Sequence, residues 1–530
     1  MEYEVTAKNF INGEFVDSAE FIDSFDPSVG KPWAKIPNSS REEVLAAVKA
    51  AKDAFPLWSK MLVSDRCHIM TKIADLIESK QDELAAAESR DQGKPLWLVK
   101  MVDIPRAAIN FRHFASVIQS ATNMSMTRDD QKALYYTSRE PVGVAGLISP
   151  WNFPLYLLTF KIAPAIAFGN TVVAKPSEMT SVTASMICSI FKEAAIPDGF
   201  LMKTGSQLDM FYLATIFEEL QLLSCQVLSS NWCCLSAFNC VPPGVINIVH
   251  GTGPRTGEAI LENPDVSLLS FTGSTAVGKR ILESSAKNLR KVSLELGGKN
   301  PAIVCDDVDL DKCIPELAKA SFVNQGEVCL ASSRIYVAQK IYRDFLDRFI
   351  SEARKWKVGP PSKPDTKVGA LISEAHMKKV KTYIDLARKE GATICCGHGV
   401  DDLSLPPEIK NGYYVLPTVI TNIADTSRCM TEEIFGPVTC IVPFETEEEA
   451  ITKANSLNYG LSASVWTQSI SKSQRISRAL QAGTVWVNCW MLRDLRVPFG
   501  GYKMSGIGRE GSVGSHEFFT EEKTTCIRYD

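Results

Sequence analysis

The chain has 530 residues and a formal net charge of −4, with 57 Lys and Arg against 61 Asp and Glu. That length exceeds one ordinary hydrophobic core, so we expect two large lobes and a smaller element. A mildly acidic chain without a basic tract excludes nucleic acid as its main partner. The first residues lack the pattern of a signal peptide, and Glu218 and Glu219 interrupt the most apolar window. We therefore expect no membrane span and a cytoplasmic location.

The cysteines number fifteen, form no CxxC pair and have no His at zinc-finger spacing. An odd number of thiols without an export signal indicates reduced cysteines. No metal site is expected.

Helices are predicted at residues 41–53 and 63–88, followed from about residue 143 by alternating strands and helices. The strands are predicted at 142–149, 170–175, 245–251, 266–274 and 291–298, and the helices at 161–169, 183–195, 253–262 and 278–289. Such alternation predicts a parallel, doubly wound α/β sheet. A second alternating stretch, from Pro301 to about Val497, predicts a second α/β lobe.

Two segments remote in sequence look like exposed strands: one follows residue 123, and the other lies in the C-terminal tail. Exposed strand edges pair with each other or with another subunit. A homo-oligomer, either a dimer or a tetramer, is expected.

Three side chains stand out chemically, each with an ordinary alternative. Cys329 follows the Gln-Gly-Glu turn of NQGEVC, a flexible polar setting in which a thiol could be exposed and activated, although a lone cysteine is more often buried filler. Glu295 ends an apolar strand, where its pKa can rise, although a solvated strand-end carboxylate is the alternative. Asn152 lies between Pro150 and Pro154, so its amide could serve as a fixed oxyanion donor or simply belong to a turn.

The motifs SPWNFPL, NTVVAKPSE, FTGSTAVG, LELGGKNP, NQGEVC, EEIFGPV and PFGGYKMSGIGRE, in this order and spacing, resemble the aldehyde dehydrogenase superfamily. The resemblance covers the chain except about residues 198–242. It implies an NAD-binding domain (1–122 and 142–297, with 198–242 as an insertion), a catalytic domain (298–504), and a β oligomerisation arm and tail (123–141 and 505–530).

The resemblance also implies roles for individual residues. Cys329 matches the nucleophile that forms a thiohemiacetal and then a thioester, and Asn152 matches the oxyanion donor. Glu295 matches the base that activates water for hydrolysis of the thioester. Lys161 matches a lysine near that glutamate that relays its proton, with a solvated helix lysine as the alternative.

The implied cofactor is NAD. A carboxylate at the adenosine ribose accepts hydrogen bonds from its hydroxyls and repels a 2′-phosphate, which favours NAD over NADP. The residues that match the cofactor site are Lys175 and Glu178 at that ribose, Trp151, Gly273 and Ser274 at the pyrophosphate, and Glu433 and Phe435 at the nicotinamide ribose.

Two arginines at positions that line the substrate tunnel bear on the choice of aldehyde. Arg106 and Arg493 would lie in the wall of an otherwise apolar channel that includes Phe153, Phe160 and Phe499. Guanidinium groups there are costly unless an anion pairs with them. We therefore expect an aldehyde that also bears a carboxylate. The positions resemble those of family members that act on muconic semialdehydes, which implies oxidation of 2-aminomuconic 6-semialdehyde to 2-aminomuconate in tryptophan (kynurenine) catabolism.

Three alternatives remain at this point. Both arginines could form salt bridges with local acids such as Asp103 or Asp494. The substrate could be retinal or another apolar aldehyde. The chain could also be a catalytically silent or crystallin-like variant, because residues 198–242 interrupt a helix-to-strand connection between two Pro-x-Gly stops. That connection is expected at the sheet edge opposite the cofactor.

Overall fold

The computed structural model describes residues 3–195, 241–397 and 405–529. Its larger sheet has eight strands in the order β22-β12-β11-β8-β9-β10-β2-β3. The five central strands are parallel: β8 (Val144–Ile148), β9 (Thr171–Lys175), β10 (Ile246–Ile248), β11 (Val266–Thr272) and β12 (Lys291–Glu295). The strands at the two edges, β2 (Asn9–Ile11), β3 (Glu14–Val16) and β22 (Gly506–Ile507), pair antiparallel.

The parallel part runs β12-β11-β8-β9-β10, which is the order of a doubly wound sheet. The fold class predicted from the alternation is therefore confirmed. The order reverses between β8 and β11, and a doubly wound sheet binds its ligand at such a switch point, beyond the carboxyl ends of the strands.

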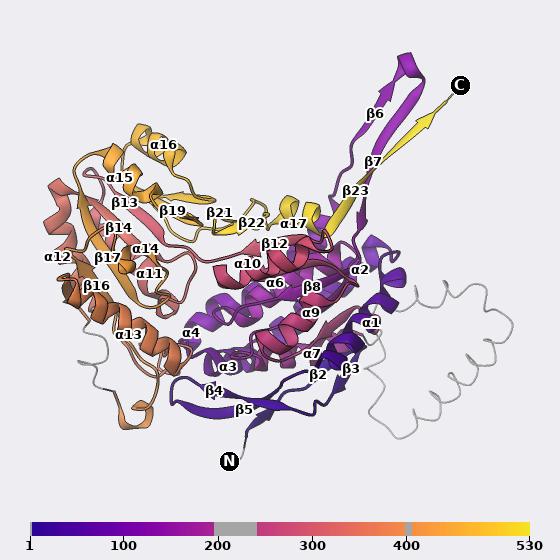
Figure 1. Cartoon of the computed structure of the whole chain (residues 1–530), viewed down its shortest axis with the longest axis horizontal. Helices are drawn as coiled ribbons and strands as arrows, with labels where there is room; N and C mark the ends of the chain where they lie inside the picture. The colour runs from indigo at the N-terminus through magenta and orange to yellow at the C-terminus, as the bar shows by residue number, and fades with distance from the viewer. Residues whose placement is uncertain (1–2, 196–240, 398–404, 530) are drawn as a thin grey trace.

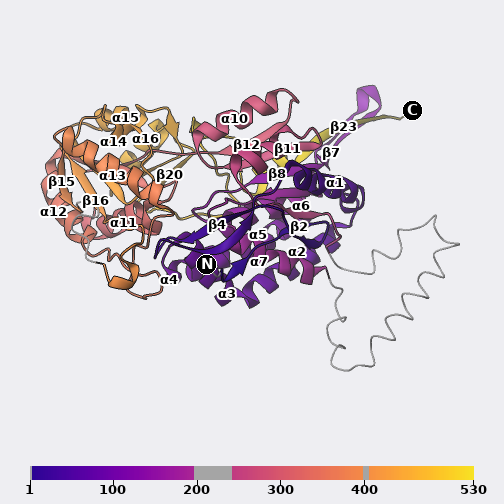
Figure 2. The same cartoon turned by 60° about the horizontal axis from the view of Figure 1, so that its bottom comes forward.

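Helices cover both faces of this sheet (Figures 1 and 2). They are α1 (Arg41–Trp58), α2 (Val63–Ser79), α3 (Gln81–Gln92), α4 (Leu96–Leu98), the π-helix η1 (Val99–Asp103), α5 (Ile104–Gln119), α6 (Pro154–Ala167), α7 (Val182–Ala194), η4 (Gly253–Gly257), α9 (Glu258–Glu262) and α10 (Thr275–Ala286). Helix α6 starts with Pro154 at its first turn and is buried along nearly its whole length, since it is apolar on all sides. Each large apolar side chain buried in this way contributes roughly 1.5 to 3 kcal/mol.

The second lobe lies beside the first and is built on a seven-stranded sheet in the order β15-β16-β17-β14-β13-β19-β20 (Figure 1). Its strands are β13 (Asn300–Val304), β14 (Ser332–Ala338), β15 (Thr393–Cys396), β16 (Thr418–Thr421), β17 (Val438–Phe444), β19 (Ser462–Trp466) and β20 (Thr484–Val487). Its helices are α11 (Leu310–Phe322), η5 (Val323–Gly326), α12 (Tyr342–Ala353), α13 (Glu374–Lys389), α14 (Arg428–Thr431), α15 (Glu447–Asn455) and α16 (Ile470–Ala479). All its strand pairs except β15-β16 are parallel, as the second alternating stretch predicts.

A three-stranded antiparallel sheet, in the order β23-β7-β6, projects from the molecule (Figure 1). The strands are β6 (Ser125–Arg128), β7 (Ala133–Pro141) and β23 (Thr520–Arg528), with α17 (Ser512–Phe519) leading into β23. The two strands expected to be exposed do pair with each other, from Thr520 opposite Pro141 to Arg528 opposite Ala133. The domain boundaries themselves stay a prediction; residues 506–507 pair with β12 in the large sheet and not with the arm.

The remaining strands form two small sheets: β1 (Val5–Thr6), β5 (Lys31–Pro37) and β4 (Phe21–Asp26) in one, and β18 (Tyr459–Gly460) with β21 (Tyr502–Lys503) in the other. Most of residues 198–242 lie outside the described part of the chain. The described ends of that connection are the end of α7 and the start of β10, and β10 runs parallel to β9. The connection therefore joins the sheet at the edge opposite the carboxyl ends of the strands. Among the described helices, none is long and apolar enough to cross a membrane.

Candidate active site

Cys329 lies in the turn between η5 and β14. The residues before it were expected to be flexible, and that expectation is wrong: Asn324, Gln325 and Glu327 are fully buried. Asn324, Gln325 and Gly326 all have positive φ angles, of 53°, 56° and 71°. A Cβ at Gly326 would lie 2.2 Å from the main-chain oxygen of Gly436, so only glycine fits there. The turn that presents the thiol is thus held rigidly by its packing.

The Cys329 side chain is partly buried and lines a cavity, and its surroundings favour the protonated thiol. Burial, together with the nearby Glu433 and Glu295 carboxylates, raises its pKa to about 12, and the positive charge of Arg493 opposes the shift. The thiolate is the reactive form of cysteine, so binding of ligands or transfer of the proton has to precede attack.

Asn152 reaches the same cavity from the loop after β8. It is 4% exposed, and its side-chain amide Nδ2 donates a hydrogen bond of 2.9 Å to the main-chain oxygen of Glu327. Asn152 and Cys329 both line a cavity of about 260 Å³. Since an amide has two N–H groups, one remains for a ligand oxygen in this cavity. The pair can therefore present a nucleophile and an oxyanion donor to one carbonyl group.

Glu295, the last residue of β12, is 4% exposed, and its Oε1 has no hydrogen-bond partner within the described residues. Burial and the neighbouring Glu510 raise its pKa well above the ordinary value, while Lys161 and Arg493 oppose the shift. A raised pKa suits a carboxyl group that must take up a proton near neutral pH. Glu295 does not itself line the 260 Å³ cavity, whose wall beside it is formed by the next two residues, Leu296 and Gly297.

Lys161 is buried in α6 and is not the solvated helix lysine of the alternative interpretation. Its ammonium group donates to Ser270 Oγ at 3.0 Å and to Glu510 Oε1 at 3.1 Å. Sequence reasoning missed Glu510. This residue pairs with Lys161 and raises the pKa of Glu295, so it couples the two groups electrostatically. Its position in the final motif, GIGRE, is the one signal that could have identified it.

A groove of about 470 Å³ lies at the switch point of the large sheet and continues into the cavity at Cys329, with which it shares Trp151, Gly273 and Ser274. Ser274 caps the N-terminus of α10, where helix N–H groups and the helix dipole favour phosphate. At the far end, Lys175 donates to the main-chain oxygen of Gly251 at 2.7 Å and to Glu178 at 3.4 Å. The groove therefore offers a cradle for a pyrophosphate and a carboxylate for a ribose, which fits a dinucleotide.

The cavity end of the groove holds Glu433 and Phe435. Glu433 Oε1 accepts a hydrogen bond of 3.0 Å from Gly298 N, and a Cβ at Gly297 would lie 2.3 Å from its Oε2. The ring of Phe435 is 5.2 Å from that of Trp151. All of the sequence-predicted cofactor residues thus lie along one continuous groove.

Two residues of this groove were missed in the sequence. His376 and Lys379 line the cavity from α13. His376 hydrogen-bonds the main-chain oxygen of Phe435 at 2.6 Å, and its ring is 5.5 Å from that of Trp151. Their spacing of three residues puts both on one helix face, but nothing in the local sequence indicates that this face meets a cavity.

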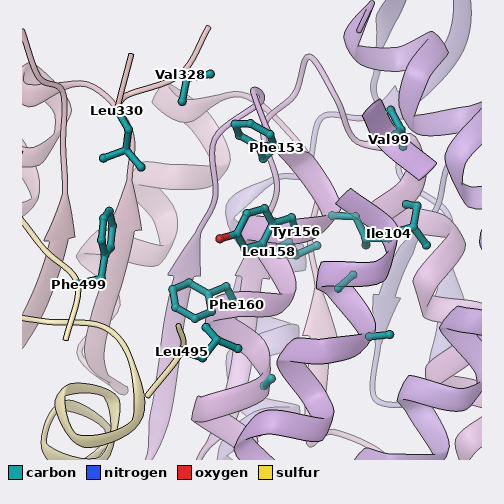
Figure 3. Close-up of a cluster of buried hydrophobic side chains, with 14 of the residues drawn as sticks. Val99, Ile104, Phe153, Tyr156, Leu158, Phe160, Val328, Leu330, Leu495 and Phe499 are labelled. Atoms are coloured by element: carbon teal, nitrogen blue, oxygen red, sulfur yellow. The ribbon is translucent and has the colours of Figure 1, made fainter. Parts of the chain in front are cut away.

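The aromatic side chains predicted to line the substrate channel are buried. Figure 3 shows Tyr156 and Phe160 on α6 and Phe153 just before it, with the Tyr156 hydroxyl pointing toward the side on which Phe499 lies. Phe153 and Phe160 pack against Tyr156 at ring distances of 5.9 and 6.2 Å. These side chains therefore form an aromatic cluster whose polar atom is the Tyr156 hydroxyl.

The two arginines converge on Tyr156 from opposite lobes. Arg493 Nη1 donates to the Tyr156 hydroxyl at 3.4 Å, and its guanidinium carbon lies 3.8 Å from the centre of the Phe499 ring. Arg106 lies 5.4 Å from the centre of the Tyr156 ring, and its Nε and Nη2 are buried without a hydrogen-bond partner among the described residues.

The salt-bridge alternative for these arginines is wrong, because the two acids have other partners. Asp103 pairs with Lys94 at 2.7 Å, and Asp494 accepts from Arg496 Nε at 2.9 Å. Buried guanidinium N–H groups without partners are costly, so an anion from outside the chain would satisfy them.

Comparison with known proteins agrees with this geometry. The model of the aldehyde dehydrogenase family matches residues 15–209 and 226–525, and the chain belongs to that family. It is 52% identical over 526 residues to 2-aminomuconic semialdehyde dehydrogenase of Mus musculus and 51% identical over 529 residues to that of Danio rerio. These alignments cover 98% of each chain for the mouse protein, and 100% of this chain and 99% of the relative for the zebrafish protein.

Solved structures agree as well. The NAD+ complex of an aldehyde dehydrogenase from Bacillus cereus superposes with a TM-score of 0.87 at 36% sequence identity, covering 99% of this chain and 97% of that one.

Proposed function

We propose that this chain oxidises 2-aminomuconic 6-semialdehyde to 2-aminomuconate with NAD, a step of tryptophan (kynurenine) catabolism. Family membership supports the reaction class, and the printed names of relatives at about half identity support the substrate. The choice of substrate rests on Arg106 and Arg493, because neither arginine pairs with an acidic side chain among the described residues. A substrate with an aldehyde at one end and a carboxylate at the other matches Cys329 and the two arginines together.

The proposed chemistry follows from the positions of the side chains. The Cys329 thiolate adds to the aldehyde carbon, and the carbonyl oxygen becomes an oxyanion that accepts from the Asn152 amide and the Cys329 main-chain N–H. NAD, when bound, supplies the acceptor for the hydride that leaves that carbon. The resulting thioester is attacked by a water molecule whose proton passes to Glu295, and the C–S bond breaks to regenerate the thiolate and release the acid.

The cofactor would be held by residues of the groove. The first turn of α10 at Ser274 would receive the pyrophosphate, Glu178 the adenosine ribose, and Glu433 the nicotinamide ribose. Lys175 would fix Glu178, since its ammonium group already bonds that carboxylate and the Gly251 carbonyl.

The test of the substrate assignment compares an acidic aldehyde with a neutral one. For Arg493→Ala and Arg106→Ala, kcat/KM for the semialdehyde should fall at least 30-fold, from loss of a charged pair worth roughly 2 kcal/mol or more. The value for a neutral aldehyde of similar length should change less than about threefold. Arg496→Ala is the matched control, because this exposed arginine pairs with Asp494 outside the channel. Equal losses for both aldehydes would refute a carboxylate clamp.

The two other candidate functions are disfavoured by the same residues. An apolar aldehyde such as retinal would leave the buried nitrogens of Arg106 without partners. A silent or structural variant does not account for Cys329 and Asn152 lining one cavity, with the Glu295 carboxyl group close enough to raise the pKa of the thiol. NADH formation with retinal and with the semialdehyde separates these possibilities.

The arm supports the proposal of a homo-oligomer. Strand β23 has one paired and one free edge among the described residues, and Ile527 and Tyr529 are exposed near its end. A second copy could extend this sheet or cover its face. Light scattering of the intact chain and of a chain ending at Phe519 should give a smaller particle for the truncated form.

A further inference from the structure

The loop that carries Asn152 rests on a buried ammonium group, that of Lys94. Lys94 follows Gly93, the residue that caps the C-terminus of α3. Gly93 has a φ of +88°, and a Cβ there would lie 2.7 Å from the main-chain oxygen of Ala370. The Lys94 side chain is fully buried. The main chain at this point is fixed by the turn, so the direction of the Lys94 side chain is fixed as well.

The ammonium group of Lys94 contacts three different segments of the chain around the candidate site. Lys94 Nζ donates to the main-chain oxygen of Asn152 at 2.7 Å and to Asp103 Oδ1 at 2.7 Å. It also lies 4.1 Å from the centre of the Phe153 ring, which is one of the side chains expected to line the substrate channel. Asp103 ends the π-helix η1 and stands three residues before Arg106 in the sequence. The Lys94 side chain thus contacts the Asn152 main chain, the Phe153 ring and Asp103, which directly precedes the helix that carries Arg106.

The charge of Lys94 acts on three buried acids: Asp103, Glu88 and Glu327. Glu88 Oε1 accepts from Leu155 N at 2.9 Å, and its Oε2 accepts from the Thr183 hydroxyl. Burial and the charge of Asp103 raise the pKa of Glu88 to about 8, and burial raises the pKa of Asp103 and of Glu327 as well. The positive charge of Lys94 opposes all three shifts, and removing one partner of a buried ion pair is costly because it leaves an uncompensated charge.

Asn152 is held through both its side chain and its main chain. Its Nδ2 is anchored to Glu327, and its main-chain oxygen accepts from Lys94 and from Asn324 Nδ2 at 3.0 Å. Of the two donors to that oxygen, only Lys94 is charged, and hydrogen bonds from charged donors are about twice as strong as neutral ones.

We propose that Lys94, paired with Asp103, is a positioning residue that holds the main chain of Asn152 and so fixes the oxyanion amide relative to the substrate channel. This inference rests on the proposed role of Asn152 as oxyanion donor. A shift of about 1 Å in a reacting group costs on the order of 100-fold in rate, so loss of Lys94 acts on the chemical step. It leaves the dinucleotide groove unchanged, because Lys94 does not line it.

The test uses Lys94→Met, which removes the charge at nearly constant length, and the double variant Lys94→Met/Asp103→Asn, which removes both charges. Arg66→Met is the matched control for loss of a buried cation. Arg66 lies in α2 and also donates to a main-chain oxygen, that of Met61 at 2.8 Å. Asn152→Ala is the reference for loss of the amide.

Each variant is assayed as the full chain for thermal unfolding, for kcat and KM with aldehyde and NAD, and for hydrolysis of p-nitrophenyl acetate. The ester reaction acylates Cys329 through an oxyanion without a dinucleotide.

We expect both Lys94 variants to lose about 10- to 100-fold in kcat for oxidation and for ester hydrolysis, with KM for NAD within about twofold of the unmodified chain. The double variant should regain thermal stability relative to Lys94→Met without regaining kcat. Arg66→Met should lower the melting temperature and leave kcat unchanged. If Lys94→Met does not fold, the double variant is used for the test.

Two results would overturn the inference: a folded Lys94 variant with kcat within about twofold of the unmodified chain while Asn152→Ala is inactive, or a double variant that regains both stability and kcat. Retained activity in Asn152→Ala would instead refute the proposed oxyanion role, which is a separate failure.

Discussion

The side-chain amide of Asn152 donates to the main-chain carbonyl of Glu327 at 2.9 Å, across a sequence separation of 175 residues. Asn152 follows β8 of the large sheet, and Glu327 lies in the turn before Cys329, which belongs to the second lobe. This hydrogen bond therefore locks the proposed oxyanion donor to the segment that presents the nucleophile. The cavity lined by Asn152 and Cys329 is thus bridged by a side chain from one lobe and a main-chain carbonyl from the other.

Alkylation should show that Cys329 is protonated in the free protein. With a pKa of about 12, only a minute fraction is thiolate near neutral pH, so iodoacetamide should label Cys329 at least 10-fold more slowly than the exposed Cys526. Peptide mass spectrometry at about pH 8 measures both rates in one sample. In Arg493→Ala the rate at Cys329 should fall further, since the charge of that arginine lowers the thiol pKa. Labelling of Cys329 as fast as Cys526 would contradict the raised pKa.

Glu295→Gln should separate the two halves of the reaction. Without the carboxylate, acylation of Cys329 continues but the water is not deprotonated, so NADH should appear as a burst of about one equivalent per active site. The steady-state kcat should fall by roughly 100-fold or more. Stopped-flow absorbance of NADH distinguishes this from a variant that fails to form the thioester, which would show no burst.

The same substitution should stabilise the fold at alkaline pH. Burial raises the pKa of Glu295 in the folded state, so folded and unfolded chains are both protonated below the ordinary glutamate pKa, and stability is lost as the pH rises toward the folded-state pKa. Glu295→Gln does not titrate, and we expect it to be more stable than the unmodified chain by about 1 to 3 kcal/mol at high pH. Near pH 4 the difference should vanish. Urea unfolding at both pH values tests this, and a difference independent of pH would contradict it.

Gly326→Ala should abolish activity through the shape of the cysteine turn. A Cβ there would lie 2.2 Å from the Gly436 oxygen, so the turn must move. We expect kcat/KM to fall by about 100-fold or more, since the nucleophile moves with the turn. Gly391→Ala is the matched control: Gly391 has φ +81° but no atom within 4 Å of its Cβ position. It should lower stability by about 1 kcal/mol and leave kcat/KM unchanged.

Deleting residues 198–242 should keep or increase the yield of active protein. The described ends of this connection, α7 and β10, meet at the sheet edge opposite the groove, so no residue of the proposed site is removed. Loop closure for a segment of this length contributes only about 1 to 2 kcal/mol. Yield of soluble protein and kcat of the deleted form are the measurements. Loss of activity in a folded deletion variant would show that the segment is integral.

The sequence by itself determined the fold class and pointed to the residues proposed to react. The alternating strands and helices predicted a parallel, doubly wound sheet, because buried β-branched runs and helical spacing are local properties of the chain. The motifs around Cys329, Asn152 and Glu295 identified the chemistry, because each motif is a short contiguous segment. The groove at the switch point was located only once the strand order was known, since its position depends on that order.

Only the tertiary structure decided the protonation states and the supporting contacts. The turn at Cys329 looked flexible in the sequence, yet its polar side chains are buried between two lobes, and that burial raises the thiol pKa. Glu510 pairs with Lys161 across 349 residues, and Lys94 reaches Asn152 across 58. Desolvation and hydrogen bonding depend on which segments are in contact in the folded protein, and a local sequence pattern does not predict those contacts.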